Sequence, residues 1–309
     1  MNSPHISAIL VDYNAGPELG HALRSIADEL AGQSWEAIVV DNASSDDSGA
    51  IVAEFAPQAR LIRNEENVGF GRGVNQGLAV AAARLVLIMN PDCRLVAGAF
   101  EALKQELAKR ESTAVVGPRI LDPDGSNQGN ARGDPDMLTG LFGRTTLLRR
   151  VLPGLTISKR NVVGDEVLRE GHASIRVDWL SGACMLARRD ALVAVHGFDE
   201  RYFLYWEDAD LCRRLRAVGY QVRYVPGATA VHRVGHSSQR ARSSAIRAFH
   251  ESAYLYYETH VAPGGSQMRF ARRVRRRLKR MLARLILAAR CRLHVHRSRH
   301  PAASQHLLN

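Results

Sequence analysis

Three acidic side chains, Glu207, Asp208 and Asp210, lie within four positions at the predicted start of a helix, directly after the bulky run FLYW. Acidic residues near a helix N-terminus are often only favourable partners of the helix dipole. That explanation covers one or two of them, but not their position beside Tyr205 and Trp206, whose rings suit the face of a sugar. A carboxylate at this position is expected to keep a low pKa and to act as a general base.

Polar residues also follow four apolar runs in the first third of the chain. In chain order they are Asp12, Tyr13 and Asn14, then Asp41 and Asn42, then Asn67, and finally Asn90 and Asp92. Because ligands of open α/β sheets bind at the carboxyl ends of the strands, the four groups are expected to meet in one crevice. An Asp at a strand end can accept hydrogen bonds from a base or a ribose. Ser45 or Asp46 could, in addition, cap the following helix.

The run IMNPDC at residues 88–93 leaves Asp92 at the edge of the predicted sheet. Mg²⁺ and Mn²⁺ prefer oxygen ligands, and such an ion neutralises the charge of a departing nucleotide diphosphate. Taken alone, Asn-Pro-Asp is more typical of an ordinary turn. His232, which follows a predicted strand and a Pro-Gly turn, is a second candidate ligand of the metal or of a phosphate, although a lone His is more often structural.

The segment ENVGFGRGVNQGL at residues 66–78 has glycines at 69, 71, 73 and 77, which allow a backbone to approach a ligand closely. A strand, a glycine cluster and a helix could also indicate a dinucleotide-binding fold. The spacing here is GxGxxxG instead of GxGxxG, and Asp41 precedes the glycines instead of following them. Both differences argue against that alternative.

The elements that must position these residues alternate in the pattern of a parallel sheet with crossover helices. Strands are predicted at 6–11, 37–40, 60–63 and 85–89, and helices at 19–30, 46–55, 73–83 and 97–110. Residues 122–175 have weak periodicity and predict a long loop or lid. After the acidic cluster and its helix, a strand at 221–225 and a helix at 240–259 are predicted.

Seven motifs, in this order, resemble the family-2 glycosyltransferases, particularly their bacterial rhamnosyltransferase-like branch. They are VDYN, VVDNASSDDS, NVGFGRGVNQG, MNPD, WLSGACMLARRDAL, GFDERYFLYWEDADLCRR and VHRVGHSS, and they span roughly residues 6–260. The resemblance implies a GT-A fold, an α/β architecture in which a Rossmann-like nucleotide-binding mixed sheet is joined to an acceptor-binding half. The expected domain covers residues 1–262, and a basic helical tail covers 263–309.

The resemblance also implies roles for individual residues. The nucleotide sugar is expected to contact Asp12, Tyr13, Asn14, Asp41, Asn42, Asn67, Gly69, Arg72, Asn75 and Asn90. The divalent cation, Mg²⁺ or Mn²⁺, is expected at Asp92, which matches the last acid of the family's DXD element, and at His232. The acceptor is expected near Trp179, Gly182, Trp206, Glu207 and Asp210. Asn90 stands where the first Asp of the DXD element would be, which leaves the metal with fewer protein charges.

The same resemblance implies an inverting mechanism in which Asp208 takes the proton from an acceptor hydroxyl. The expected donor is dTDP-rhamnose, with a UDP-hexose as the second possibility. The acceptor is expected to be a glycan or a lipid-linked glycan. A nucleotide-sugar-binding protein without turnover would need the same residues, and only an activity measurement separates it from the enzyme.

The formal net charge of +11 is concentrated in the tail, because thirteen of the 42 Lys and Arg residues lie at 266–300, where there is no Asp or Glu. The tail has apolar residues at 274, 278, 281, 282 and 285, which form one helical face typical of a helix in a membrane interface. A solvated or nucleic-acid-binding arm is the alternative. Nucleic acid is not expected as a partner, because it gives no reason for the acids at the strand ends.

The location predicted from these features is cytoplasmic, with peripheral attachment to the inner face of the plasma membrane. The N-terminus has no pattern of a secretory signal, and the longest apolar run of the tail, 285–289, is too short to cross a bilayer. The four cysteines are scattered without a CxxC pair, which favours a reducing compartment.

Overall fold

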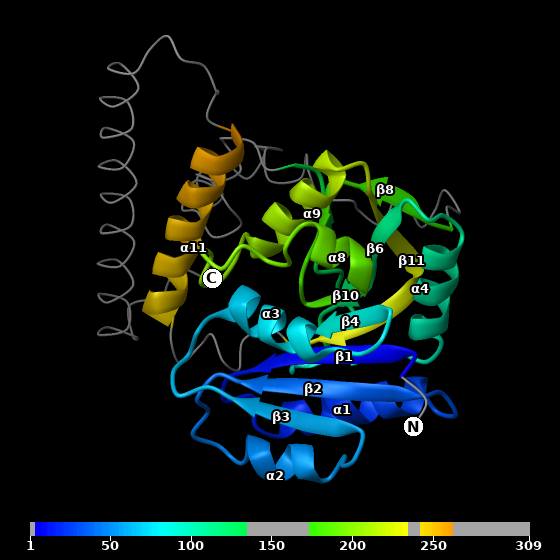
Figure 1. Ribbon diagram of the computed structural model, residues 1–309, viewed down its shortest axis with the longest axis vertical. Coiled ribbons are helices and arrows are strands. Elements are labelled where there is room, and N and C mark those ends of the chain that lie inside the picture. Colours follow the sequence, from blue (N-terminus) through cyan, green and yellow to red (C-terminus); the bar gives the residue numbers. More distant parts are fainter. Residues whose placement is uncertain (1–3, 135–172, 234–241, 262–309) are drawn as a thin grey trace, which may run out of the picture.

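The computed structural model describes residues 4–134, 173–233 and 242–261 (Figure 1). The strands are β1 (Ile6–Asp12), β2 (Trp35–Asp41), β3 (Ala59–Arg63), β4 (Leu85–Met89), β5 (Cys93–Leu95), β6 (Thr113–Leu121), β7 (Ala131–Arg132), β8 (Ile175–Val177), β9 (Trp179–Leu180), β10 (Cys184–Arg188) and β11 (Gln221–His232). The helices are α1 (Pro17–Glu29), α2 (Ser48–Ala53), α3 (Phe70–Val80), α4 (Ala99–Ala108), α8 (Arg189–Ala194), α9 (Glu207–Ala217) and α11 (Arg242–Tyr256), the last followed by a π-helical turn (Tyr257–Val261).

One mixed sheet forms the centre of the molecule. Its strand order is β3-β2-β1-β4-β10-β6-β11-β5, with β8 paired to β11. The strands β3, β2, β1 and β4 are parallel, so their carboxyl ends share one edge, whereas β10 runs antiparallel between β4 and β6. The short pair β7 and β9 lies outside this sheet. The chain therefore completes the sheet only with β8, β10 and β11, which begin at residue 175 or later.

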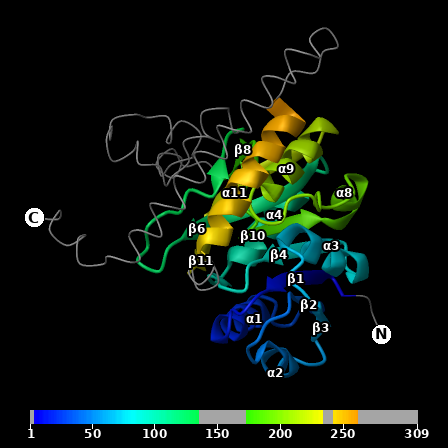
Figure 2. The same cartoon turned by 90° about the vertical axis from the view of Figure 1, so that its left-hand side faces the viewer.

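The two faces of the sheet bury separate hydrophobic cores. On one face, Ile6, Ala8 and Leu10 of β1 pack with apolar residues of α1, α2 and α4. On the other face, Ile9 and Val11 pack with α3, α8 and α9. Figure 2 shows α1 and α2 on one side of the β1–β3 strands and α3 on the other. This alternation follows from the two-residue period of a strand, and it explains why the parallel strands are continuous apolar runs.

Helix α3 lies close to β1 because glycines face that strand. A Cβ atom at Gly77 would lie 2.6 Å from Cγ2 of Ile9, and one at Gly73 would lie 2.9 Å from Cγ1 of Val11. Side chains at these positions would push the helix away from the sheet. Two of the glycines predicted to approach a ligand therefore have a packing role.

The predicted parallel strands and their helices are confirmed to within three residues at each end. The predicted Pro-Gly turn before His232 is wrong, because β11 continues through Pro226 and Gly227 with an irregular register between Val225 and Thr229. Strands β5, β6, β8, β9 and β10 had no counterpart in the prediction. Part of the predicted loop at 122–175 and the whole tail at 263–309 lie outside the described residues.

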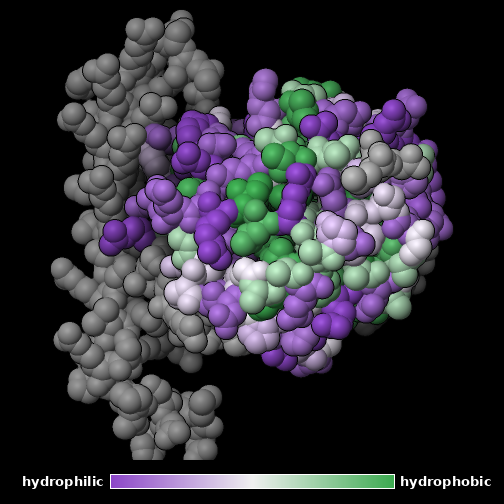
Figure 3. Space-filling view, turned by 60° about the horizontal axis from the view of Figure 1, so that its bottom comes forward, coloured by the Kyte–Doolittle hydropathy of each residue, from purple (hydrophilic) through white to green (hydrophobic). Residues whose placement is uncertain are grey.

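The described surface has few large exposed hydrophobic side chains. They come from separate elements and are Tyr13, Val80, Val96, Val193, Phe203 and Val218. In Figure 3, hydrophobic residues gather near the middle of one face and are surrounded by hydrophilic ones. Among the described helices, none combines the length and the apolar character needed to cross a membrane. Cys93, Cys184 and Cys212 are buried and free.

Candidate active site

The carboxylates at the ends of β1 and β2 hold the loop that leads into α2. Asp12 is buried and accepts hydrogen bonds from the hydroxyls of Ser48 and Ser44, at 2.5 and 3.0 Å. Asp41, also buried, accepts from the backbone N–H of Ser44 at 2.7 Å and from Nε of Arg63 at 3.2 Å. Burial raises the pKa of Asp12, and the two serine hydrogen bonds oppose the rise. Both predicted nucleoside ligands thus lie together.

Tyr13 and Asn14 lie beside the same loop. Asn14 has a left-handed backbone with φ of 56°, and its side-chain oxygen accepts from the backbone N–H and the hydroxyl of Ser45 at 2.8 and 3.0 Å. Tyr13 is 38% exposed and is the residue of this group most available to a ligand. Asp46, which with Ser45 is a candidate cap of the following helix, accepts from the backbone N–H of Gly16 and from that of Ser48, the first residue of α2.

Asn42 joins the ends of β2 and β3 to the start of α3. Its buried side-chain amide donates to Oδ1 of Asn67 and to the carbonyl oxygen of Gly69, both at 3.2 Å, and accepts from Asn64 at 2.8 Å. Three of the four predicted strand-end groups are therefore connected by direct hydrogen bonds. The convergence expected from the parallel order of the strands is present for these three.

Gly69, at the start of α3, contacts the loop at residues 203–206 that precedes the acidic residues of α9, here called the acidic loop. Its φ is 90°, and a Cβ atom there would lie 2.4 Å from the carbonyl oxygen of Phe203. That oxygen accepts a hydrogen bond from the backbone N–H of Phe70 at 3.0 Å. A left-handed conformation and a backbone contact both require glycine, so this position joins the two halves of the site.

Arg72 and Asn75 point from α3 toward residues 198–200. The amide of Asn75 accepts from the backbone N–H of Phe198 at 2.8 Å and donates to its carbonyl oxygen at 2.9 Å. Arg72 lies 3.7 Å from Glu200, and both side chains are half exposed. The structure thus gives Asn75 a role in connecting α3 to the loop before the acidic cluster.

The predicted metal ligands lie next to one another at the ends of β4 and β11. Nε2 of His232 is 3.1 Å from Oδ1 of Asp92 and 3.3 Å from the side-chain amide of Asn90. Gln128 contacts His232 twice. Its Oε1 lies 3.0 Å from Nδ1 of the imidazole, and its Nε2 donates to the backbone oxygen of His232 at 2.7 Å. A His whose Nδ1 is hydrogen-bonded in this way presents Nε2 as a ligand.

This geometry fits a divalent cation. Adjacent ligands of an octahedral ion with bonds of about 2.1 Å lie roughly 3 Å apart, which is the separation of Asp92 Oδ1 and His232 Nε2. Within the described ranges no group of three or more His, Cys, Asp or Glu side chains suits a metal. The described residues therefore offer two candidate ligands at this place, and a bound diphosphate and water would have to supply the others.

The acidic cluster begins after two residues with unusual backbone angles. Tyr205 and Trp206 have φ of 68° and 72°, which is a strained conformation for bulky side chains. Asp208 follows, and its Oδ2 accepts from the backbone N–H of Gly182 at 3.0 Å while Oδ1 accepts from that of Ala209 at 2.8 Å. These two hydrogen bonds thus fix the orientation of Asp208 in the first turn of α9.

The expectation of a low pKa for Asp208 is wrong. Burial raises the pKa of its carboxyl, and the two backbone hydrogen bonds and the charge of Arg132 only partly oppose the rise. Burial depends on the neighbouring elements, and the local sequence does not show it. A raised pKa makes a stronger base, which suits a group that must remove a proton.

Glu207 is more deeply buried than its neighbour. It is 5% exposed, and its Oε2 has no hydrogen-bond partner among the described residues. Burial first, and then the charge of Asp208, raise the pKa of Glu207 well above its usual value. The two adjacent acids therefore have different surroundings.

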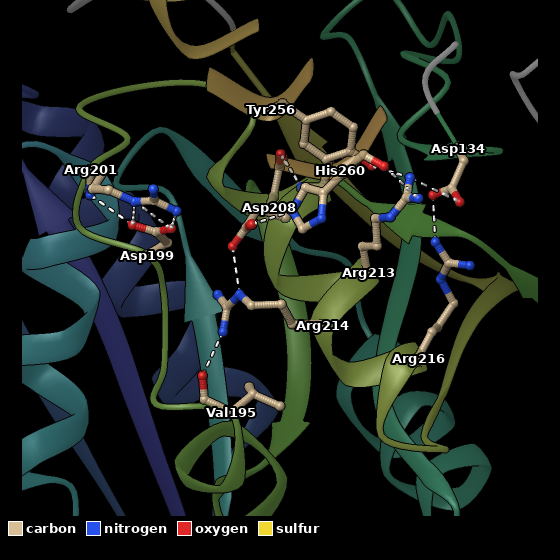
Figure 4. Close-up of polar contacts among 12 residues, drawn as sticks. Asp134, Val195, Asp199, Arg201, Asp208, Arg213, Arg214, Arg216, Tyr256 and His260 are labelled. Atoms are coloured by element: carbon tan, nitrogen blue, oxygen red, sulfur yellow. Dashed lines mark hydrogen bonds and ion pairs between the residues drawn. The ribbon is translucent and has the colours of Figure 1, made fainter. Parts of the chain in front are cut away.

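Both carboxylate oxygens of Asp210 are paired with side chains of the protein. Its Oδ2 accepts from Nε of Arg214 at 2.7 Å, and its Oδ1 lies 2.6 Å from Nε2 of His260. Arg214 also donates to the carbonyl oxygens of Val195 and Gly197 at 2.5 and 2.8 Å, the first of which is visible in Figure 4. Asp210 thus ties α9 to the end of α8 and to the turn after α11.

The aromatic residues predicted to carry the acceptor pack partly against protein. The ring of Trp206 lies 5.3 Å from that of Tyr256 and 5.7 Å from that of Phe249, both on α11. Trp179 donates from Nε1 to Gly133 at 2.9 Å, and the guanidinium of Arg132 lies 5.0 Å from its ring centre. The structure brings both tryptophans to the side of the site that carries Asp208.

Three residues of this site were absent from the sequence interpretation. Gln128 and Arg132 belong to the stretch predicted as a loop, where no periodicity indicates their positions. His260 lies 50 residues after its partner Asp210. No local pattern predicts these contacts, because each one joins elements that are distant along the chain.

We expect Arg214→Met to destabilise the protein by roughly 3 kcal/mol, because it leaves the buried carboxylate of Asp210 without its arginine. The measurement is urea unfolding followed by circular dichroism. Lys104→Met, which removes a cation from an exposed pair with Glu101, is the control and should change stability far less. Equal effects of the two substitutions would contradict this reading of Asp210.

Comparison with solved structures identifies the fold. GalNAc-T7 with UDP, GalNAc and Mn²⁺ has a TM-score of 0.60 and 15% identity, over 86% of this chain and 52% of that chain. Mannosyltransferase PcManGT from Pyrobaculum calidifontis, in complex with GDP-Man and Mn²⁺, has a TM-score of 0.54 and 16% identity, over 86% and 66%. At these identities the likeness concerns the fold alone, and it confirms the expected GT-A architecture of the described α/β body.

Sequence comparison identifies the family. Residues 7–164 match the model of Glycosyl transferase family 2, and residues 162–303 match that of Glycosyl transferase family group 2. N-acetylglucosaminyl-diphospho-decaprenol L-rhamnosyltransferase of Mycobacterium tuberculosis is 33% identical over 81% of this chain and 83% of its own length. Rhamnosyltransferase WbbL of Escherichia coli K12 is 42% identical over 26% of this chain and 30% of its own. The chain belongs to glycosyltransferase family 2, as an inverting enzyme of its rhamnosyltransferase-like branch.

Proposed function

We propose that this enzyme transfers rhamnose from dTDP-rhamnose to a hydroxyl group of a glycan or lipid-linked glycan, with Asp208 as the general base. The choice of sugar is supported by the names of the two similar rhamnosyltransferases, one of which acts on a diphosphate-linked lipid acceptor. The contacts of Asp208 carry the catalytic part of the proposal, because two backbone N–H groups orient its carboxylate without removing its basicity.

The donor would occupy the edge formed by the ends of the parallel strands. We assign to it the residues Asp12, Tyr13, Asn14, Asp41, Asn42, Asn67, Gly69, Arg72, Asn75 and Asn90. Their hydrogen-bonded connections, which join the ends of β1, β2 and β3, support this assignment. Several of them would act through the backbone they hold, as Asn75 holds Phe198, and Tyr13 would offer an exposed ring.

Asp92 and His232 would hold the divalent cation. When bound, the ion would stabilise negative charge on the leaving diphosphate. Gln128 would fix the ring of His232, since it contacts both Nδ1 and the backbone oxygen of that residue. Asn90 would lie beside the same ligand atom.

The proposed reaction is a single displacement. Asp208 takes the proton of the acceptor hydroxyl while the hydroxyl oxygen forms a bond to the anomeric carbon. The bond from that carbon to the diphosphate oxygen breaks on the opposite face, so the configuration inverts. Trp179, Gly182, Trp206 and Glu207 would surround the acceptor, and Asp210 would position α9. Help from a general base of this kind contributes roughly 10²- to 10⁴-fold in rate.

We expect Asp208→Asn to reduce transfer by at least about 10²-fold while donor binding is retained, because the amide cannot accept the proton. Turnover and donor affinity should be measured on the same preparation, the latter by calorimetry. Asp28→Asn, at an exposed position at the end of α1, is the control and should behave like the wild type. Substantial turnover of Asp208→Asn would refute the assignment of the base.

A panel of nucleotide sugars tests the donor and the cation together. With a lipid-diphosphate acceptor and Mg²⁺ or Mn²⁺, dTDP should be released from dTDP-rhamnose, and EDTA should stop the release. Asp92→Asn should raise the metal concentration for half-maximal activity by at least about 10-fold. Release of UDP from a UDP-hexose, without release of dTDP, would mean that the donor is a UDP-hexose and not dTDP-rhamnose. Activity that EDTA does not change would contradict the proposed metal site.

We also propose that the basic tail at 263–309 binds an anionic membrane surface, where a lipid-linked acceptor would be located. Its excess of Arg and its apolar spacing support this proposal. The intact chain should float with vesicles that contain anionic lipid, and a chain ending at residue 261 should not. The difference should shrink at high salt, because screening weakens the attraction of basic residues to the surface. Equal flotation of the two chains would refute the role of the tail.

A further inference from the structure

Glu207 is a buried carboxyl group without the partners that a buried charge requires. The side chain of Glu207 packs against the start of α3. A Cβ atom added at Gly71 would lie 3.7 Å from Cβ of Glu207. Glu207 is 5% exposed, and its Oε2 has no hydrogen-bond partner in the described part of the chain. A carboxylate taken out of water without a cation, and with only its own backbone amide as a donor, is strongly disfavoured relative to its protonated form.

The charged groups near Glu207 make ionisation harder still. The like charges of Asp208 and Asp210, both on α9, raise the pKa of Glu207 further. The charge of Glu207 in turn raises the pKa of Tyr205 in the preceding loop. Arg214 and the imidazole of His260 both contact Asp210. Arg132, from β7, acts on Asp208. Among the described ion pairs, none includes Glu207. The dipole of α9 favours a negative charge here, but this effect is small beside the cost of burial.

Asp208 differs from Glu207 in each of these respects. Two backbone N–H groups donate to its two oxygens, and a guanidinium acts on it. When two adjacent acids compete for one proton, the proton resides on the group whose ionised form is less well stabilised. That group is Glu207.

We propose that Glu207 is held as a neutral carboxylic acid, so that the Glu207–Asp208 pair carries one negative charge and that charge resides on Asp208. Glu207 is then a positioning residue, which decides which of the two acids is the base. Ionised Glu207 would place a second negative charge beside Asp208 and the developing charge of the leaving group. The inference rests on the proposed function only in naming Asp208 as the base.

Two matched amide substitutions test the proposal in activity. Glu207→Gln replaces a neutral acid by a neutral amide of the same size, so the acidic limb of the kcat/KM pH profile, which reports the ionisation of Asp208, should not move, whatever the substitution does to acceptor binding. Asp208→Asn should lose at least about 10²-fold. A shift of the acidic limb to lower pH in Glu207→Gln would mean that Glu207 carries a negative charge beside Asp208 in the wild type, and it would overturn the inference and leave the base assignment intact. Retained turnover in Asp208→Asn would instead overturn the base assignment.

A stability measurement tests the protonation itself, whatever the donor or acceptor. A carboxyl group stabilises the folded protein when its pKa is higher in the folded than in the unfolded state. This stabilisation is fully present below the pKa of the unfolded state, which is about 4.3 for Glu. It is lost as the pH rises toward the pKa of the folded state. Glu207→Gln lacks this titration, whereas all other groups are shared. The folding equilibrium constant of the wild type should therefore fall relative to Glu207→Gln by up to about 10-fold per pH unit between pH 5 and 7.

The readout is denaturant unfolding of the full chain at several pH values. The exposed Glu54→Gln serves as the control for the substitution itself. A difference between wild type and Glu207→Gln that stays constant over this pH range would mean that Glu207 is ionised in the folded protein, and it would overturn the inference. A difference that grows with pH, absent from the Glu54→Gln control, would support it.

Discussion

The backbone contact between Gly69 and Phe203 fixes the geometry on which the rest of the site depends. It holds the acidic loop against the first turn of α3, while Asn42 bonds the same glycine to the strand ends. The loop is held from the opposite side as well, because Ser252 of α11 donates to the carbonyl oxygen of Leu204 at 2.9 Å. Two non-glycine residues with positive φ can persist there because contacts on both sides determine the path of the chain.

Each carboxylate of the site is surrounded in a way that suits one role. Serine hydroxyls hold Asp12, a backbone amide and an arginine hold Asp41, and Arg214 and His260 hold Asp210. Asp208 combines a backbone donor on each carboxylate oxygen with a raised pKa, whereas Oε2 of Glu207 has no donor among the described residues. Side chains locked by such neighbours need little rearrangement during reaction, which is the property expected of a preorganised site.

The sequence predicts the first half of the fold better than the second. Strands β1 to β4 are short apolar runs between amphipathic helices, and local periodicity is enough to locate them. Strand β10 is also apolar, but its place between β4 and β6 depends on antiparallel pairing with residues about 70 to 100 positions earlier. The acids could be recognised by type and spacing, whereas the burial of Asp208 and Glu207 and the contacts of Gln128, Arg132 and His260 arise only from the assembled fold.

The strand order has a consequence for how the protein is made. In space, β10 lies between β4 and β6, and β11 lies between β6 and β5, although both are translated after residue 183. A nascent chain that has emerged only to residue 164, where the first family match ends, would leave β6 without either neighbour and β4 with an open edge. Such edges invite pairing with other chains. The β4 edge of the parallel half therefore stays open until β10, which ends at Arg188, has left the ribosome, and β6 gains its second neighbour only with β11, which ends at His232.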